Sequence, residues 1–168
     1  RKQNERAYRH MYLGEAVGTG GQVFGNVTLR SLTRAELDAH PRAWAGLDFG
    51  FANDPDALVI CRYDRRGRRL LICGEHVRAG QSLRALAEAC AGLAGGGVIR
   101  CDSASPREIA ELRRQGVNAV AVRKGAGSVE HGIRWLCEQA ELVIDPARCP
   151  AAAREFSTYE YARDPSGA

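Results

Sequence analysis

Lysine is nearly absent from this 168-residue chain, and so are the signatures of several protein classes. No run approaches the roughly 18 apolar residues that cross a bilayer, so we expect no membrane-spanning segment and no secretory signal. The six cysteines form no Cys-x-x-Cys pair, which disfavours a zinc site and a disulfide framework. No Walker A phosphate loop occurs, so we assign no ATP hydrolysis. With 45% hydrophobic and 26% charged residues, the chain has the composition of one globular domain.

Arginine carries almost all of the positive charge. Of the 24 basic residues only Lys2 and Lys124 are lysine, and the formal net charge is +4. A guanidinium group is planar and can hold a phosphate through two hydrogen bonds. The composition therefore suits a surface that binds a nucleic-acid backbone, and it is equally well explained by a GC-rich genome that favours arginine codons.

Hydrophobic patterning predicts a mixed α/β fold. We expect three strands over residues 44–50, 57–63 and 68–77, and residues 64–67 have the Asp and Gly of a tight hairpin. We then expect helices and strands to alternate over residues 82–90, 98–102, 106–115, 117–122, 128–139, 142–144 and 151–161. A three-strand antiparallel meander followed by such alternation implies one mixed sheet flanked by helices.

The first 40 residues differ from the rest. Residues 18–25 contain four glycines, which is typical of a loop or linker. A short helical turn follows, with Thr33 at its N-cap and Glu36 completing a capping box. We therefore divide the chain into a tail or linker over residues 1–40 and an ordered domain over residues 41–168.

Two aspartates lie where strands are expected to end. Asp48 closes the first strand, and Asp102 closes the first strand after a helix. In a sheet of this order the two strands should be neighbours, so the carboxyl groups would lie about 5 Å apart. Carboxylates that close repel each other, and a divalent cation relieves the repulsion. The alternative is that each aspartate only forms a turn or caps a helix, although Ser105 already supplies an N-cap after Asp102.

Other residues are weaker candidates. Asp54 could reach the outer shell of a metal, or it could belong to an ordinary Asn-Asp-Pro turn. Lys124 lies in a Gly-rich loop before a helix, where a phosphate could bind, or the loop could be merely flexible. The arginines of the predicted hairpin could follow a DNA backbone, or they could simply be solvated: Arg65, Arg66, Arg68 and Arg69.

Five segments together resemble the C-terminal nuclease domain of phage terminase large subunits. They are residues 12–15 (YLGE), 46–59 (GLDFGFANDPDALV), 102–104 (DSA), 122–133 (VRKGAGSVEHGI) and 155–161 (EFSTYEY). Each motif is weak alone, but the set covers nearly the whole chain in the family's order. The first of them resembles the passage from the family's ATPase domain into its nuclease domain.

The resemblance implies a ribonuclease H-like fold and an endonuclease that cuts concatemeric double-stranded viral DNA during packaging. The family's first two metal-binding acids correspond to Asp48 and Asp102, which would hold two Mg²⁺ or Mn²⁺ ions. Its third ligand follows the Tyr-rich segment, so we expect that ligand to be missing and the domain to be truncated at its C-terminal end. The implied partners are DNA, an ATPase domain, a small terminase subunit and a portal, in the cytoplasm of a bacterial host.

Two alternatives stay open at this point. Without its third ligand, the chain could be a DNA-binding or assembly module that does not cut. Residues 46–50 (GLDFG) also resemble the first phosphate loop of actin-like and sugar-kinase ATPases, although 168 residues cannot hold the second subdomain that such enzymes need.

Overall fold

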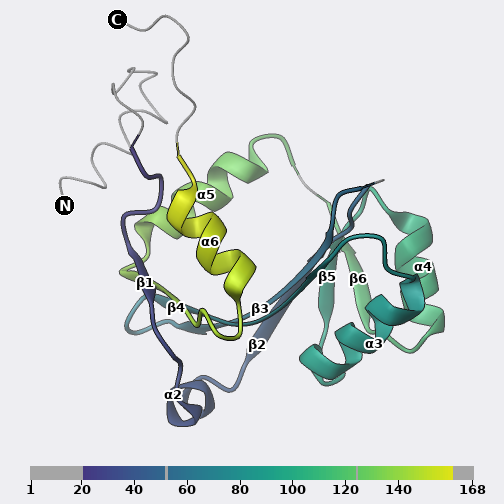
Figure 1. Cartoon of the computed structure of the whole chain (residues 1–168), viewed down its shortest axis with the longest axis horizontal. Helices are drawn as coiled ribbons and strands as arrows, with labels where there is room; N and C mark the ends of the chain where they lie inside the picture. The colour runs from purple at the N-terminus through teal and green to yellow at the C-terminus, as the bar shows by residue number, and fades with distance from the viewer. Residues whose placement is uncertain (1–20, 52, 124, 161–168) are drawn as a thin grey trace, which may run out of the picture.

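The architecture is a seven-stranded mixed sheet with helices on both faces, as seen in a computed structural model that describes residues 21–51, 53–123 and 125–160 (Figure 1). In chain order the elements are β1 (Val27–Leu29), α2 (Arg34–Ala39), β2 (Ala43–Asp48), β3 (Asp56–Asp64), β4 (Arg69–Arg78), α3 (Leu83–Ala94), β5 (Ile99–Asp102), α4 (Pro106–Arg114), β6 (Ala119–Val122), α5 (Ser128–Glu138), β7 (Glu141–Ile144) and α6 (Pro150–Thr158).

The strand order is β1-β7-β4-β3-β2-β5-β6. Strands β2, β3 and β4 pair antiparallel, which confirms the predicted meander. The remaining pairs, β1 with β7, β7 with β4, β2 with β5 and β5 with β6, are parallel. Because parallel neighbours need a crossover connection, helices separate these strands in the sequence.

Two layers of side chains divide the core between the two faces of the sheet. Alternate residues of β2 and β3, such as Leu47 and Leu58, pack with α3 and α4. On the opposite face, Leu70 and Ile72 of β4 pack with α5, α6 and the segment before β1. Helix α2 covers the first face again, through Leu37 against Leu71 and Val143. Figure 1 shows the consequence: α5 and α6 lie over the β1 side of the sheet, whereas α3 and α4 lie beside β5 and β6.

The linker predicted over residues 1–40 is not what the structure shows for residues 21–40. Strand β1 joins the sheet beside β7, and Val23 and Phe24 are 5% and 6% exposed. The Phe24 ring lies 4.8 Å from the ring of Phe156 and 5.6 Å from that of Tyr159. Burial of Phe24 against these rings offsets the flexibility that the glycines would otherwise confer. Residues 1–20 lie outside the described part of the chain.

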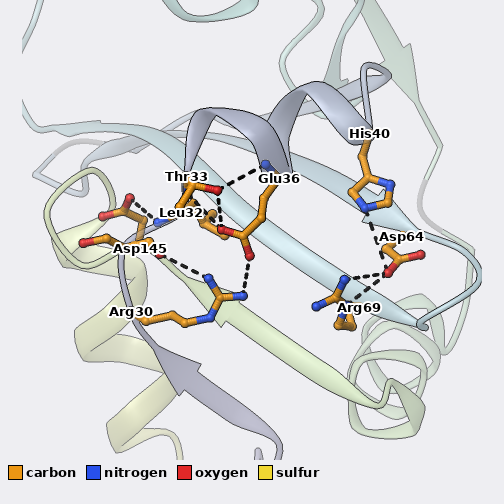
Figure 2. Close-up of polar contacts among 9 residues, drawn as sticks. Arg30, Leu32, Thr33, Glu36, His40, Asp64, Arg69 and Asp145 are labelled. Carbon is orange, nitrogen blue, oxygen red and sulfur yellow. Dashed lines mark hydrogen bonds and ion pairs between the residues drawn. The ribbon is translucent and has the colours of Figure 1, made fainter.

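Helix α2 has the predicted capping box. The Glu36 N–H donates to Thr33 Oγ1 at 3.2 Å, and the Thr33 N–H donates to the Glu36 carboxylate at 2.9 Å. Figure 2 shows Glu36 turned back toward Thr33 and Arg30. The hydrogen bond from Arg30, followed by those from Thr33, lowers the pKa of Glu36 to about 2.

Candidate metal centre

The two predicted carboxylates lie side by side on neighbouring strands. In the parallel pair of β2 and β5, Leu47 is opposite Cys101, and the next residue on each strand is Asp48 or Asp102. Adjacent strands are about 4.8 Å apart, and each acid directly follows the last residue of its strand that is paired between β2 and β5. The predicted adjacency of these two strands is thus confirmed.

Both aspartates project from the same face of the sheet. Ala45 and Leu47 of β2, like Ile99 and Cys101 of β5, are buried against α3 and α4. Side chains alternate along a strand, so Asp48 and Asp102 point to the opposite face. Asp48 is exposed and Asp102 is partly buried, which leaves the pair accessible from solvent.

Asp102 also shapes the chain that follows it. The Ala104 N–H donates to Asp102 Oδ1 at 3.1 Å, which is a local turn of the kind aspartate favours. Ser105 occupies the N-cap of α4, but its side chain accepts no capping hydrogen bond. Ser105 is thus the N-cap residue, as predicted, but its side chain does not cap the helix, and Asp102 takes part in the turn before it. Each carboxylate oxygen has two lone pairs, so this bond is compatible with metal binding.

A hydrogen-bonded chain fixes the loop after Asp48. Asp56 accepts the Gly50 N–H at 3.0 Å and the Gln81 Nε2 at 2.9 Å. Because a carboxylate only accepts, the Gln81 amide must present Oε1 to His76, whose Nε2 lies 2.8 Å away. His76 Nε2 therefore carries a proton, and the chain connects β4 with the loop beside Asp48.

Of the two weaker candidates in loops, Asp54 and Lys124, the structure describes only Asp54. Asp54 is exposed within the turn in which its N–H donates to the Phe51 carbonyl at 2.9 Å, so the turn interpretation describes its backbone. Lys124 lies outside the described residues. Its loop begins after Val122, which pairs with Asp102 in the β5–β6 ladder.

The hairpin arginines lie at the other end of the sheet. Asp48 pairs with Ala57 near the start of β3, whereas the hairpin follows Asp64 at its end. Seven residues of strand separate the two, about 23 Å. Arg69 pairs with Asp64 at 3.0 Å and Arg68 donates to the Glu138 carbonyl, while Arg65 and Arg66 are exposed. The structure does not bring this cluster to the acids.

Sequence reasoning missed a group on the acid-bearing face. The guanidinium carbons of Arg42 and Arg100 lie 4.1 and 4.6 Å from the ring centroid of Trp44. The period of two in a strand could have found it, since Trp44 is four residues before Asp48 and Arg100 is two residues before Asp102.

The cysteines do not add to the site. All six are free, and burial raises the pKa of Cys61 and Cys90 to about 11 and that of Cys149 to about 12. Such thiols stay protonated near neutral pH and are poor metal ligands. Within the described ranges, no group of three or more His, Cys, Asp or Glu side chains could hold a metal ion. In the same ranges, no helix is long and apolar enough to cross a membrane.

Residues 48–168, from the first acid onward, match the family described as the terminase RNase H-like domain. The chain belongs to this family. The resemblance found in the sequence and the ribonuclease H-like mixed sheet are thereby confirmed.

Two relatives of this terminase domain come from a Bacillus phage and from Bacillus subtilis. The terminase large subunit of Bacillus phage SPP1 is 40% identical over 172 residues, which cover 99% of this chain and 41% of that protein. The PBSX phage terminase large subunit of Bacillus subtilis is 29% identical over 130 residues, covering 73% of this chain and 28% of that protein. The chain thus spans about two fifths or less of these relatives.

A solved structure agrees with the fold of this terminase domain. The nuclease domain of the large terminase from bacteriophage SPP1, crystallised with bound Mn, superposes with a TM-score of 0.80 at 38% identity. The match covers 86% of this chain and 84% of that one.

Proposed function

We propose that this domain is a divalent-metal-dependent endonuclease that cuts concatemeric double-stranded phage DNA during genome packaging. The observation that carries the proposal is the parallel register of β2 and β5, which puts Asp48 and Asp102 on adjacent positions of one sheet face. Membership of the terminase family and the Mn-bound SPP1 nuclease domain support it. The family match leaves the actin-like alternative without support.

The donor set fits Mg²⁺ or Mn²⁺. Carboxylate oxygens are the ligands that these hard cations prefer, and Asp48 and Asp102 would hold them, with two ions as the proposed number. Such cations, when bound, activate water and neutralise charge on a scissile phosphate. Asp54 is proposed only for the outer shell. The third ligand is proposed to follow the Tyr-rich segment.

The residues of this chain position the reaction rather than perform acid–base chemistry. The Ala104 N–H holds one oxygen of Asp102, which restricts the orientation of that carboxylate. Asp56 holds the Gly50 N–H, which restricts the loop that leaves Asp48. Fixed ligands of this kind reduce the reorganisation needed when substrate binds. The exposure of Asp48 leaves room for a DNA strand to approach.

Partners of the whole protein belong to the same proposal. They are an ATPase domain, a small terminase subunit, a portal and double-stranded DNA, in the cytoplasm of the bacterial host. Lys124 is proposed as a DNA contact, since its loop follows the strand next to Asp102. The hairpin arginines Arg65, Arg66, Arg68 and Arg69 are weaker candidates because of their distance from the acids.

Substitution of the acids tests the proposal. We expect wild-type protein to cut duplex DNA in Mn²⁺ or Mg²⁺ and not in EDTA. Asp48→Asn and Asp102→Asn should each slow cutting by more than about 100-fold, since loss of even the partners of metal ligands costs 10- to 100-fold. The readout is the rate of plasmid cleavage at saturating Mn²⁺, with the thermal midpoint showing that the fold is intact.

Asp38→Asn is the matched control, because Asp38 is exposed on α2 and forms a surface ion pair with Arg34. Undiminished cutting by either site variant would contradict the proposal. The finding of only two acids together among the described residues favours a second candidate, a DNA-binding module that does not cut. That candidate predicts binding without cleavage even at high Mn²⁺, with activity regained when the chain is extended by roughly 30 residues.

A further inference from the structure

Arg42 and Arg100 differ from the arginines of this fold that form ion pairs. Six arginines form ion pairs with carboxylates: Arg30, Arg34, Arg69, Arg84, Arg114 and Arg148. In the part of the chain that the structure describes, neither Arg42 nor Arg100 has a carboxylate partner. Both instead lie over Trp44, at 4.1 and 4.6 Å from its centroid. Two like charges are therefore gathered at one aromatic ring.

The surface around this ring is open. A Cβ atom added at Gly46, between Trp44 and Asp48, would meet no described heavy atom within 4 Å. Val120 and Val122 of the neighbouring strand β6 are each 41% exposed. Helices α5 and α6 pack on this same face, but over the other half of the sheet (Figure 1). The face formed by β2, β5 and β6 is thus uncovered by the described helices.

Strand geometry relates the ring to the acids. Trp44, Gly46 and Asp48 follow one another along one face of β2, and Gly46 is paired with Arg100. Four residues of strand put the ring about 13 Å from Asp48. One DNA strand carries a phosphate for about every 3.4 Å of helix axis, so a strand that lay along β2 from the acids would reach the ring after about four nucleotides.

We propose that Arg42 and Arg100, held on Trp44, bind the phosphate backbone of DNA and align one strand over the open face toward Asp48 and Asp102. This inference rests on the proposed function, whose substrate it positions. Charge complementarity favours a polyanion, because two guanidinium groups without carboxylates repel each other until an anion lies between them. Stacking on Trp44 orders their donors in advance, which reduces the entropy lost on binding.

The test measures the salt dependence of DNA binding. Affinity of the 168-residue chain for a fluorescent duplex is determined in EDTA at several salt concentrations, so that no cutting occurs. The double variant R42Q/R100Q should lower the slope of log K against log salt by about 2, one unit for each phosphate that is no longer bound. At 0.1 M salt, that change corresponds to an affinity roughly 60-fold weaker.

Two further variants separate charge from fold. R42K/R100K keeps both charges and should retain most of the wild-type slope. If the substitutions instead unfolded the protein, R42K/R100K and R42Q/R100Q would both lose salt-dependent binding. R34Q/R84Q removes the same charge from helices α2 and α3, which cover the opposite face of the sheet, and should change the slope by less than about half a unit. The thermal midpoint of each variant is measured alongside.

The binding measurements test the role of Arg42 and Arg100 independently of whether the protein cuts DNA. A slope unchanged in R42Q/R100Q, or lowered as much in R34Q/R84Q, overturns the inference even if wild-type protein cuts DNA. Absence of DNA binding by the wild type also overturns it. A slope lowered only in R42Q/R100Q upholds it, even if no cutting is found and the nuclease proposal fails.

Discussion

At the residue scale, two glycines near Asp48 have opposite requirements. A Cβ at Gly46 would meet open space, whereas a Cβ at Gly50 would lie 2.0 Å from the Asp54 carbonyl oxygen and 2.7 Å from two further backbone atoms. Backbone atoms cannot move aside as a flexible side chain can. The loop after Asp48 therefore closes only around a residue without a side chain.

This contrast gives a matched pair of substitutions. Gly50→Ala should lower the free energy of unfolding by about 1–3 kcal/mol, because the loop must open to admit the methyl group. Gly46→Ala should raise it by about 0.5 kcal/mol, since alanine loses less backbone entropy in a strand. Urea denaturation at neutral pH measures both. Equal effects of the two substitutions would contradict the close approach at Gly50.

The residues at the site were predictable to different degrees. Asp48 and Asp102 stood out in the sequence because each ends an apolar strand, and strand order brings such ends together. Trp44 and Arg100 were not found; the period of two could have placed them on the face of the acids, but their contact depends on the pairing register and on rotamers. Lys124 stays a prediction. The hairpin arginines formed a conspicuous charge run, but the direction of β3 carries them away from the acids.

At the element scale, α2 and the end of β7 are joined through one buried carboxylate. Asp145 is 3% exposed, and it accepts the Leu32 N–H at 3.0 Å and the Ala147 N–H at 3.1 Å. Figure 2 shows Asp145 beside Leu32 at the start of this segment. Burial alone would raise the pKa of Asp145, but the backbone donors outweigh it and hold the pKa below its ordinary value.

Asp145→Asn should therefore change stability in a pH-dependent way. The carboxylate contributes fully above its unfolded pKa of about 3.9, and this contribution is lost as the pH falls through the lower folded pKa. We expect the variant to be less stable by about 1.5–3 kcal/mol at pH 7, with the difference shrinking below about pH 4. Urea denaturation across this range measures it. The control Asp38→Asn, on the exposed side of α2, should stay within about 0.5 kcal/mol of wild type.

The elements themselves were largely predictable. Helix α2 began at its predicted capping box, and the turn between β3 and β4 lay at the predicted Asp and Gly. Strand β1 was missed, since three residues after a Gly-rich run carry no readable alternation. What fixes that strand is not local: it pairs with β7, more than 100 residues later in the sequence.

At the scale of the whole molecule, the two cores sit on opposite faces of opposite halves of the sheet. Each half is covered on the face where its larger core lies, the β4–β7 half also by α2 on the other face, and β3 in the middle contributes to both cores through Leu58 and Val59. The mixed sheet followed from the order of elements. The positions of the two cores on opposite faces could not be predicted from that order, because they depend on which face of the sheet each crossover helix covers.

The acid pair at the carboxyl ends of β2 and β5 limits how many DNA strands the proposed nuclease can cut in one binding event. The two strands of a duplex run with opposite polarity, and one pair of carboxylates can address only one of them at a time. A break through both strands then takes two events, by a second molecule or by one that has turned over. Supercoiled plasmid should thus become open-circular before it becomes linear, as gel electrophoresis over time would reveal; linear product without an earlier nicked form would contradict this.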